Sequence, residues 1–196
     1  AGPVKSFFAL HNEDAIYGLF PTGNSSTPYS IQRRADRGTI ARRSVIMDEA
    51  GNQMFMRRDG VYLWDGSNPP VKVSGNFDGI QFWDKVNQDR LEYSFAIENR
   101  AKNQVIFAIP YGTNQTLMNK YVIWNYKRQQ WVGVFDDYTR IRGAYFDGFP
   151  HFGGSGDGLL YKHNTGTNDI STAIKSFAAL AATPPMSIAD VARWLY

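Results

Sequence analysis

The stretch from Arg58 to Gly66, Arg-Asp-Gly-Val-Tyr-Leu-Trp-Asp-Gly, contains a tight turn, a short apolar run and a second turn. Asp-Gly between apolar runs is a strong short-range signal of a β-hairpin, because glycine adopts the positive φ that such turns require. We therefore predict that Met54–Met56 and Val61–Trp64 pair as antiparallel strands on either side of Asp59-Gly60.

Two later stretches resemble this one. Tyr121–Asn125 repeats the apolar run that ends in Trp, and Gly156–Asn164 repeats the Asp-Gly entry. A unit of about 40 to 45 residues with about four short strands is typical of a propeller blade, whose faces are covered by its neighbours. We predict an all-β, β-propeller-like fold of about three to four antiparallel blades. The smallest closed ring has about four blades, so an incomplete ring stays open as an alternative, as does an irregular β-sandwich.

Short β-rich runs separated by turn residues occur along most of the chain. Ser44–Met47 is apolar on consecutive positions, which predicts a strand covered on both faces. Residues 77–90 differ, because Ile80, Trp83 and Val86 are spaced near a helical period, so we expect a short helical insertion there. The other runs that we expect to form strands are Val4–Leu10, Ala15–Phe20, Tyr29–Arg34, Val71–Val73, Tyr93–Ile97, Gln104–Ile109, Lys120–Trp124, Gln130–Phe135, Ile141–Phe146, His151–Gly153 and Leu159–Tyr161.

This pattern gives a propeller-like β domain over residues 1–175 and a C-terminal segment, 176–196, without a defined assignment. Ile174–Ala182 fits a strand or a helix, because its alanines favour a helix and the turn residues before it allow either. Ser187–Asp190 matches the capping-box pattern, which predicts a short helix over Val191–Tyr196.

The composition is that of a globular protein. Of 196 residues, 43% are hydrophobic and 20% charged, and the formal charge of +3 is too small to indicate nucleic-acid binding unless the basic residues cluster. No Cys is present, which excludes a disulfide framework and thiolate metal sites. No apolar run approaches the roughly 20 residues of a membrane-spanning helix, so we expect no membrane span.

The side chains that carry catalysis in other proteins show no catalytic spacing here. His11, His151 and His163 all lie beside predicted turns, and none are spaced as metal ligands. Asp136, Asp137, Asp147 and Asp157 are candidates for the paired carboxylates of a glycoside hydrolase. Asp before Gly is also the preferred hairpin residue, which explains two of them without catalysis. We predict that the protein is not an enzyme, and we keep a hydrolase as a third alternative.

Glycine-rich loops offer no cofactor site. Gly153-Gly154-Ser155-Gly156 precedes a β run instead of a helix and lacks the lysine of a phosphate-binding loop. Ser155–Gly158 begins like the recurrent sialidase turn, Ser-x-Asp-x-Gly-x-x-Trp, but Leu159 and Lys162 stand where that motif has Gly and Trp. We therefore expect no cofactor and no metal.

Basic residues cluster in one region. Five arginines lie within eleven positions beside one acidic residue, Asp36: Arg33, Arg34, Arg37, Arg42 and Arg43. If their strands face a channel, they form a patch that attracts phosphates independently of sequence, so they are our candidate DNA-facing or partner-facing residues. Neighbours on a strand point to opposite faces, so only about half can share a surface. The alternative is a solvated edge that discourages strand pairing or pairs with acids of a neighbouring subunit.

Aromatic and basic residues alternate from Trp124 to Arg128 and again at Trp131. Exposed rings interleaved with cations can stack on the bases of single-stranded nucleic acid. Packing of one blade on the next explains the same rings with fewer assumptions.

The order of these elements resembles the β-propeller tail and neck proteins of tailed bacteriophages. The resemblance covers about residues 7 to 175, and the Ala-rich end from Phe177 to Tyr196 lies outside it. The stretches that carry it are Ala15–Tyr17, the basic strand ending at Gly38, Ser44–Ile46, Met54–Ser67, Val73–Gly75, Asn103–Gly112, Tyr121–Tyr126, Trp131 and Phe152–Tyr161.

This resemblance implies a structural virion component, a nozzle, plug or connector in a tail or neck ring around a DNA channel. It implies a homo-oligomeric ring, contacts with other tail, portal or adaptor proteins, non-specific contact with packaged DNA, and a location in virions assembled in the host cytoplasm. The main alternative is a propeller-type module that binds a glycan or a host-surface partner.

Overall fold

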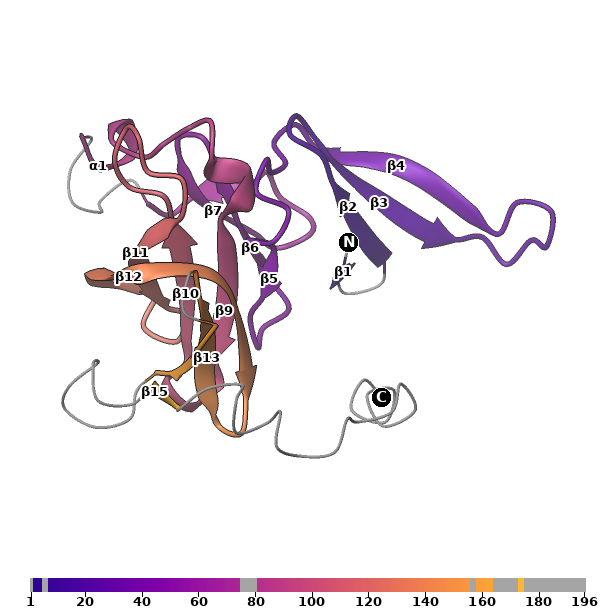
Figure 1. Cartoon of the computed structure of the whole chain (residues 1–196). Helices are drawn as coiled ribbons and strands as arrows, with labels where there is room; N and C mark the ends of the chain where they lie inside the picture. Colours follow the sequence, from indigo (N-terminus) through magenta and orange to yellow (C-terminus); the bar gives the residue numbers. More distant parts are fainter. Residues whose placement is uncertain (1, 5–6, 75–80, 156–157, 164–172, 175–196) are drawn as a thin grey trace.

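The computed structural model describes residues 2–4, 7–74, 81–155, 158–163 and 173–174 (Figure 1). These residues form three antiparallel sheets in which each strand pairs with its neighbours in the sequence. Such up-and-down sheets are the blades of a propeller. The structure confirms the predicted all-β, propeller-like fold.

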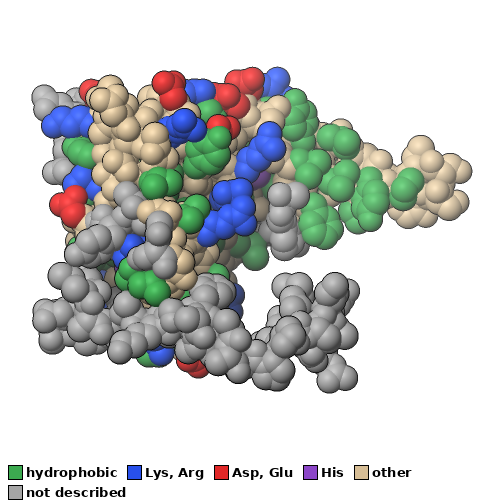
Figure 2. Space-filling model, viewed as in Figure 1, with side chains coloured by type: hydrophobic (Ala, Val, Ile, Leu, Met, Phe, Trp, Pro, Cys, Tyr) green, Lys and Arg blue, Asp and Glu red, His purple; other side chains and the backbone are tan. Residues whose placement is uncertain are grey.

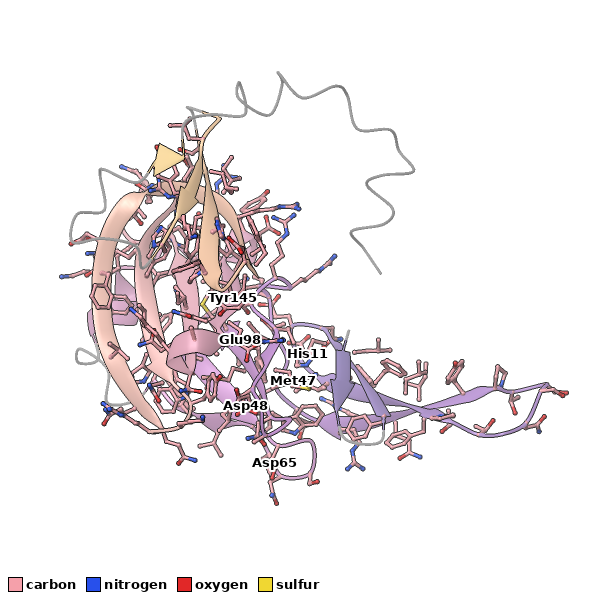
Figure 3. The ribbon with its side chains drawn as sticks, turned by 90° about the horizontal axis from the view of Figure 1, so that it is seen from below. His11, Met47, Asp48, Asp65, Glu98 and Tyr145 are labelled. Carbon is pink, nitrogen blue, oxygen red and sulfur yellow. The ribbon has the colours of Figure 1, made fainter. Side chains whose placement is uncertain are left out.

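The first sheet, which we call blade 1, consists of β1 (Gly2–Val4), β2 (Phe7–His11), β3 (Ile16–Pro21) and β4 (Tyr29–Ala35). The runs Val4–Leu10 and Ala15–Phe20, which the sequence predicts as strands, form a hairpin in which β2 pairs with β3. The strands β3 and β4 extend past the rest of the sheet as an arm that points away from the other blades (Figures 1 and 3).

The second sheet, blade 2, consists of β5 (Ile46–Met47), β6 (Gln53–Arg57), β7 (Gly60–Trp64) and β8 (Val71–Lys72). It contains the hairpin predicted from Arg58–Gly66. Its turn is displaced by one residue, since Arg57 pairs with Gly60 and Arg58 and Asp59 form the loop. Gly60 has φ +147°, and a Cβ there would lie 2.1 Å from Ser74 Oγ, so this strand position requires glycine.

The third sheet joins two blades through one long strand. It consists of β9 (Phe95–Asn99), β10 (Gln104–Ile109), β11 (Met118–Asn125), β12 (Gln130–Phe146), β13 (Phe149–Gly154), β14 (Leu160–Lys162) and β15 (Ala173–Ile174). Residues 130–136 of β12 pair with β11 and residues 142–146 pair with β13, while Arg140 between them pairs with both strands. We call β9–β11 with the first half of β12 blade 3, and the second half of β12 with β13–β15 blade 4.

Our prediction of separate strands over 130–135 and 141–146 is therefore wrong. Register shifts at Met118/Lys120 and at Arg140/Arg142 bend β12, so that one 17-residue strand leaves blade 3 and enters blade 4. The predicted turn at Asp147-Gly148 is confirmed: both residues have positive φ, at 50° and 75°.

The helical elements of the described residues are short; two lie between blades 2 and 3, and the third lies within blade 3, between β9 and β10. They are α1 (Gln81–Asp84), η1 (Leu91–Tyr93) and η2 (Arg100–Lys102). The first two fall in or beside the helical insertion predicted near 77–90, of which residues 75–80 are not described. The predicted helix over Val191–Tyr196 and most of Ile174–Ala182 also lie outside the described residues.

The blades pack face to face, and blades 2 and 3 are covered on both sides. Phe55, Tyr62 and Trp64 of blade 2 pack against blade 1, while the alternate residues of the same strands pack against blade 3. Phe152 of blade 4 packs on the far face of blade 3, beside Tyr121. The interface between blades 2 and 3 contains Met54, Met56, Val61, Val105, Phe107, Ile109, Val122 and Trp124, together with Phe82, Trp83, Val86 and Leu91 from the insertion.

Strand β5 differs from the prediction of a strand covered on both faces. Only Ile46–Met47 forms it, and Met47 is exposed. The preceding residue Ser44 is buried because its hydroxyl donates to Ala41 O and accepts from Met56 N. The apolar run Ser44–Met47 therefore includes a buried polar connection between segments.

The first strands of blades 2, 3 and 4 lie beside each other, as the innermost strands of a propeller do. Arg43, just before β5, forms a parallel bridge with Phe95 at the start of β9, and β9 also contacts β12. In Figure 1 β9 lies beside β5, and β12 curves across from blade 3. This placement brings together, along one edge of the blades, residues that precede different strands.

Candidate anion-binding site

The predicted arginine patch is divided between two places. Arg33, Arg34 and Arg37 line one groove, together with Ser67, Pro69 and Pro70 of the loop after β7. Arg43 lines a separate cleft, and Arg42 is exposed and lines neither. The five arginines therefore do not form a single surface.

Each arginine of the groove already contacts groups of its own chain. Arg33 pairs with Asp36 at 2.9 Å, with both side chains largely exposed. Arg34 donates to Gly66 O at 3.4 Å and lies over the rings of Phe7 and Phe20, and Arg37 lies over the ring of Tyr62. These contacts favour the alternative interpretation of this part of the patch, a solvated edge. Packing of the guanidinium groups on aromatic rings is an addition that the structure makes.

The cleft that contains Arg43 gathers arginines from three segments. Arg90 precedes η1, and Arg140 lies at the bend of β12, where it pairs with Met118 on one side and Gly154 on the other. The cleft has a volume of about 510 Å³, within the range of ligand pockets. Its other lining residues are Tyr93, Thr116, Leu117, Met118 and Ile141.

Among the described residues that line this cleft, every charged side chain is an arginine. Within the described part of the chain, Arg43 and Arg90 form no ion pair, and Arg90 lies over the ring of Tyr93 at 5.6 Å. Arg140 is only 3% exposed and lies over the ring of Tyr161 at 3.8 Å. Sequence reasoning found Arg43 but missed Arg90 and Arg140, because nearly a hundred positions separate the three residues and only the pairing of blades brings them together.

The carboxylates of the hydrolase alternative are separated where the structure describes them. Asp136 pairs with Lys120, and Asp147 pairs with Lys162 at 3.7 Å in the turn after β12. Asp136 lies in the part of β12 that pairs with β11, whereas Asp147 lies in the turn beyond the part that pairs with β13, and each has a different cation partner. The paired carboxylates of glycosidases instead face one sugar from about 5 to 10 Å apart. Asp157 and the side chain of Asp137 lie outside the described residues.

Among the described residues, no three His, Asp or Glu side chains are placed to hold one metal ion. Likewise, no described helix has the length and apolar character needed to cross a bilayer.

Trp124 is buried and packs edge-on against Trp131, with ring centroids 5.1 Å apart. Trp131 also donates its Nε1–H to Val73 O at 2.8 Å, so these rings join blades 2 and 3, as the packing interpretation predicted.

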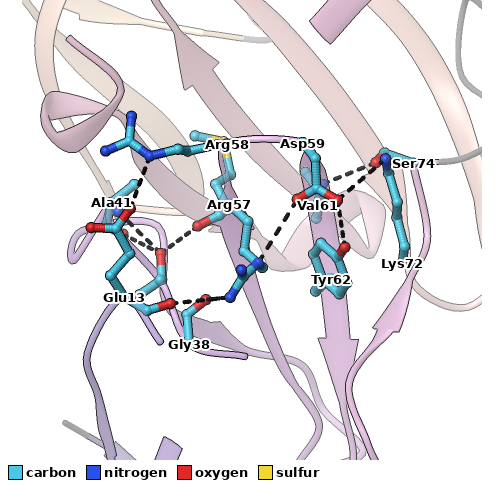
Figure 4. Close-up of polar contacts among 12 residues, drawn as sticks. Glu13, Gly38, Ala41, Arg57, Arg58, Asp59, Val61, Tyr62, Lys72 and Ser74 are labelled. Carbon is cyan, nitrogen blue, oxygen red and sulfur yellow. Dashed lines mark hydrogen bonds and ion pairs between the residues drawn. The ribbon is translucent and has the colours of Figure 1, made fainter. Parts of the chain in front are cut away.

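The polar residues of Arg58–Gly66 join blade 1 to blade 2 (Figure 4). Arg58 pairs with Glu13 at 2.8 Å, and Arg57 donates to Glu13 O and Gly38 O. Tyr62 donates its hydroxyl to Asp59 Oδ2 at 2.6 Å. Burial favours a raised pKa of Asp59, but the Tyr62 hydrogen bond and the nearby cations Lys72 and Arg57 outweigh it and lower the pKa. The stretch is a structural joint.

His11 also lies at the junction of blades 1 and 2 (Figure 3). Its Nε2 is 2.7 Å from Gln53 Oε1, and its ring packs edge-on against Phe55 and Trp64. Its Nδ1 is buried and has no hydrogen-bond partner within the described residues. Burial therefore lowers the pKa of His11, although the Gln53 hydrogen bond opposes this shift.

We expect the joint between these blades to weaken in acid. Because the pKa of His11 is lower folded than unfolded, its contribution to stability is complete above pH about 6.5 and is lost as the pH falls through the folded pKa. The urea midpoint of the wild type should drop more between pH 7.5 and pH 5 than that of His11→Gln. Equal drops in the two chains would contradict this role of His11.

These four blades define an all-β, propeller-like protein. No protein-family model matches the chain, and no curated protein sequence matches it. Solved structures do match, among them the WD40 domain of Pan2 from Neurospora crassa, with 9% identity and a TM-score of 0.42. The match covers 89% of this chain and 49% of that one, so the chain spans about half the length of the structure it matches.

Proposed function

We propose that this chain is a non-enzymatic, structural component of a tailed-phage virion, part of a tail or neck ring around the DNA channel. The resemblance of Met54–Ser67 and the other quoted stretches to phage tail and neck propellers supports the proposal. Such a component assembles in the host cytoplasm with copies of itself and with tail, portal or adaptor proteins. Its function lies in the surfaces that its blades present to those partners.

The observation that carries the proposal is that exposed apolar side chains lie on the outer side of both terminal blades, blade 1 and blade 4. On blade 1, Phe8, Leu19 and Ile31 are paired across β2, β3 and β4. Phe8 is 49% and Ile31 64% exposed, and hydrophobic side chains gather along this arm in Figure 2. On blade 4, Phe146 is 47% exposed and pairs with Phe149.

These faces point away from the neighbouring blade. Phe7 packs on blade 2, so the next residue, Phe8, points to the opposite side. Phe152 packs on blade 3, which places Phe149 and its partner Phe146 on the outer side of blade 4. An exposed apolar sheet face marks an interaction site. We propose that the outer face of blade 1 packs on the outer face of blade 4 of another copy.

Such head-to-tail contact forms rings or filaments instead of closed dimers. We expect the wild-type chain to form oligomers whose size rises with concentration in mass photometry. A blade 1 variant, Phe8→Asp/Ile31→Asp, and a blade 4 variant, Phe146→Asp, should each remain monomeric, because a buried unpaired charge opposes association. Mixed in equal amounts, the two variants should form a dimer of one each, since each retains the face that the other lost.

A matched control is Val71→Asp, which places the same charge on an exposed residue at the edge of blade 2, outside both faces. It should assemble like the wild type. A wild-type chain that stays monomeric at every concentration, and that mass spectrometry does not find in purified virions, would remove the assembly proposal. A blade 1 variant that still dimerises with itself would show that the contact is not head-to-tail.

The second candidate is a propeller-type binding module, and the arginine-lined cleft favours it. A glycan array tests this candidate directly, because a module that recognises a host glycan should give concentration-dependent signals there. An array without signals would exclude a glycan as the ligand of this module, whereas a protein ligand would stay open.

A further inference from the structure

Blades 2, 3 and 4 each have an arginine near the start of the first strand. Arg43 lies before β5. Arg90 lies directly before η1, and η1 leads into β9. Arg140 lies where β12 begins to pair with β13 of blade 4. These first strands lie beside each other, so the three arginines meet in one cleft along the edge where these strands begin. Their positions relative to these strands differ, since Arg43 and Arg90 precede a strand and Arg140 lies within β12, so it is the packing of the blades that brings them together.

The cleft combines this positive charge with an apolar surface. Tyr93 and Ile141 are 44% and 49% exposed, and Leu117 and Met118 complete the apolar part. Asp89 and Glu92 are exposed neighbours of Arg90 in the sequence, but neither lines the cleft. A ligand that fits must bring negative charge to the guanidinium groups and apolar groups to the remaining surface.

We infer that this cleft binds an acidic peptide segment of a partner protein, with carboxylates beside apolar side chains. The planar guanidinium group of arginine matches a carboxylate through paired hydrogen bonds, and arginine clusters recognise acidic motifs in other proteins. Burial of Leu or Phe side chains of the peptide against Tyr93, Leu117 and Ile141 adds affinity. The inference does not depend on the assembly of copies, because none of these residues is among those assigned to the outer faces of blades 1 and 4.

Nucleic acid fits the cleft less well than a peptide does. Binding of single strands uses a series of exposed aromatic rings on which bases stack. Among the described residues, one ring, Tyr93, lines this cleft, and Arg90 already lies over it. A duplex is a broad convex surface, and Arg140, at 3% exposure, is recessed from such a surface. The aliphatic residues offer contacts that phosphates do not use.

Fluorescence anisotropy of the full chain can test the inference. The probe is the labelled peptide acetyl-Glu-Leu-Glu-Phe-Glu-Leu-amide, and its counterpart has every Glu replaced by Gln. We expect the acidic peptide to bind at least about tenfold more tightly than the Gln peptide, and Arg43→Gln/Arg90→Gln to remove that difference. Both substituted side chains are exposed, so the variant should fold like the wild type.

The matched control is Arg42→Gln, which removes the same charge from the neighbouring exposed residue outside the cleft. It should bind the acidic peptide within about twofold of the wild type. A second variant, Ile141→Asp, keeps all three arginines but places a carboxylate at the cleft, and it should also weaken binding by at least about tenfold. If both cleft variants weaken binding while Arg42→Gln does not, the peptide binds at the cleft and is not attracted by the overall charge of the protein.

Three results would overturn the inference. The first is equal binding of the Glu and Gln peptides, or no binding of either. The second is an equal loss in Arg42→Gln and in the double variant, which would indicate non-specific attraction. The third is tighter binding of an oligothymidine of similar length than of the acidic peptide, which would assign the cleft to nucleic acid.

Discussion

A Trp64→Ala chain should unfold with a free energy about 3 to 5 kcal/mol below that of the wild type. Trp64 is 1% exposed and lies in the cluster between blades 1 and 2. Its ring centroid is 6.0 Å from that of Phe7 and 6.2 Å from that of His11, so its loss leaves a cavity lined by both blades. The loss of buried ring area and this cavity act in the same direction.

Urea unfolding followed by far-ultraviolet circular dichroism measures this change. Trp64→Phe is an informative companion: it retains an aromatic ring and removes Nε1, a buried atom without a hydrogen-bond partner within the described residues. It should cost clearly less than Trp64→Ala. Val71→Ala, at a 62% exposed position, should change the free energy by no more than about 0.5 kcal/mol. A Trp64→Ala cost as small as that would contradict the packing of blade 1 on blade 2.

Gly38→Ala should lower the free energy of unfolding by about 3 kcal/mol, although it adds only one methyl group. A Cβ at Gly38 would lie 1.8 Å from Asn12 O and 2.5 Å from Ala15 O, both backbone atoms. Neither oxygen can move freely, since Asn12 N donates to Ala15 O and Thr39 N donates to Asn12 O. The substitution must therefore displace the connection from blade 1 to blade 2.

Gly153→Ala is the matched control for this substitution. The nearest atom to a Cβ at Gly153 is Arg142 O at 4.0 Å, so the same methyl group fits there. The control should stay within about 0.5 kcal/mol of the wild type. Thermal and urea unfolding of the two variants, compared side by side, checks the prediction. Equal stability of Gly38→Ala and Gly153→Ala would contradict the close approach at Gly38.

The hairpins were predictable because their signals are local. Asp147-Gly148 has the positive φ values that its sequence predicts, and the runs Gln104–Ile109 and Lys120–Trp124 pair with Val105 opposite Trp124. Turn residues and β-branched runs act over a few positions, so they need no knowledge of distant segments.

The course of β12 was not predictable in this way. Asp136 to Arg140 is polar and interrupts the apolar pattern, which is why two strands were expected there. The structure continues through this segment because bulges turn the strand from one blade into the next. Such a turn depends on strands that pair from both sides, β11 and β13, and these lie outside any local window.

The arginines show the same limit at the level of function. Arg33, Arg34, Arg37, Arg42 and Arg43 looked like one patch because they are close in sequence. Their side chains separate into a groove with internal partners and a cleft that Arg43 shares with Arg90 and Arg140. The functional assignment of a charged residue depends on what packs around it, which a linear cluster does not specify.

For this protein, the sequence by itself determined the class of fold and most of the strands and turns, because these depend on local backbone preference and alternation. The sequence predicted Arg58–Gly66 as part of a hairpin, and the structure adds that Arg58 ties this hairpin to blade 1 through Glu13. Only the tertiary structure decided which faces remain open and which arginines meet, because long-range strand pairing and blade packing place residues that the chain keeps far apart.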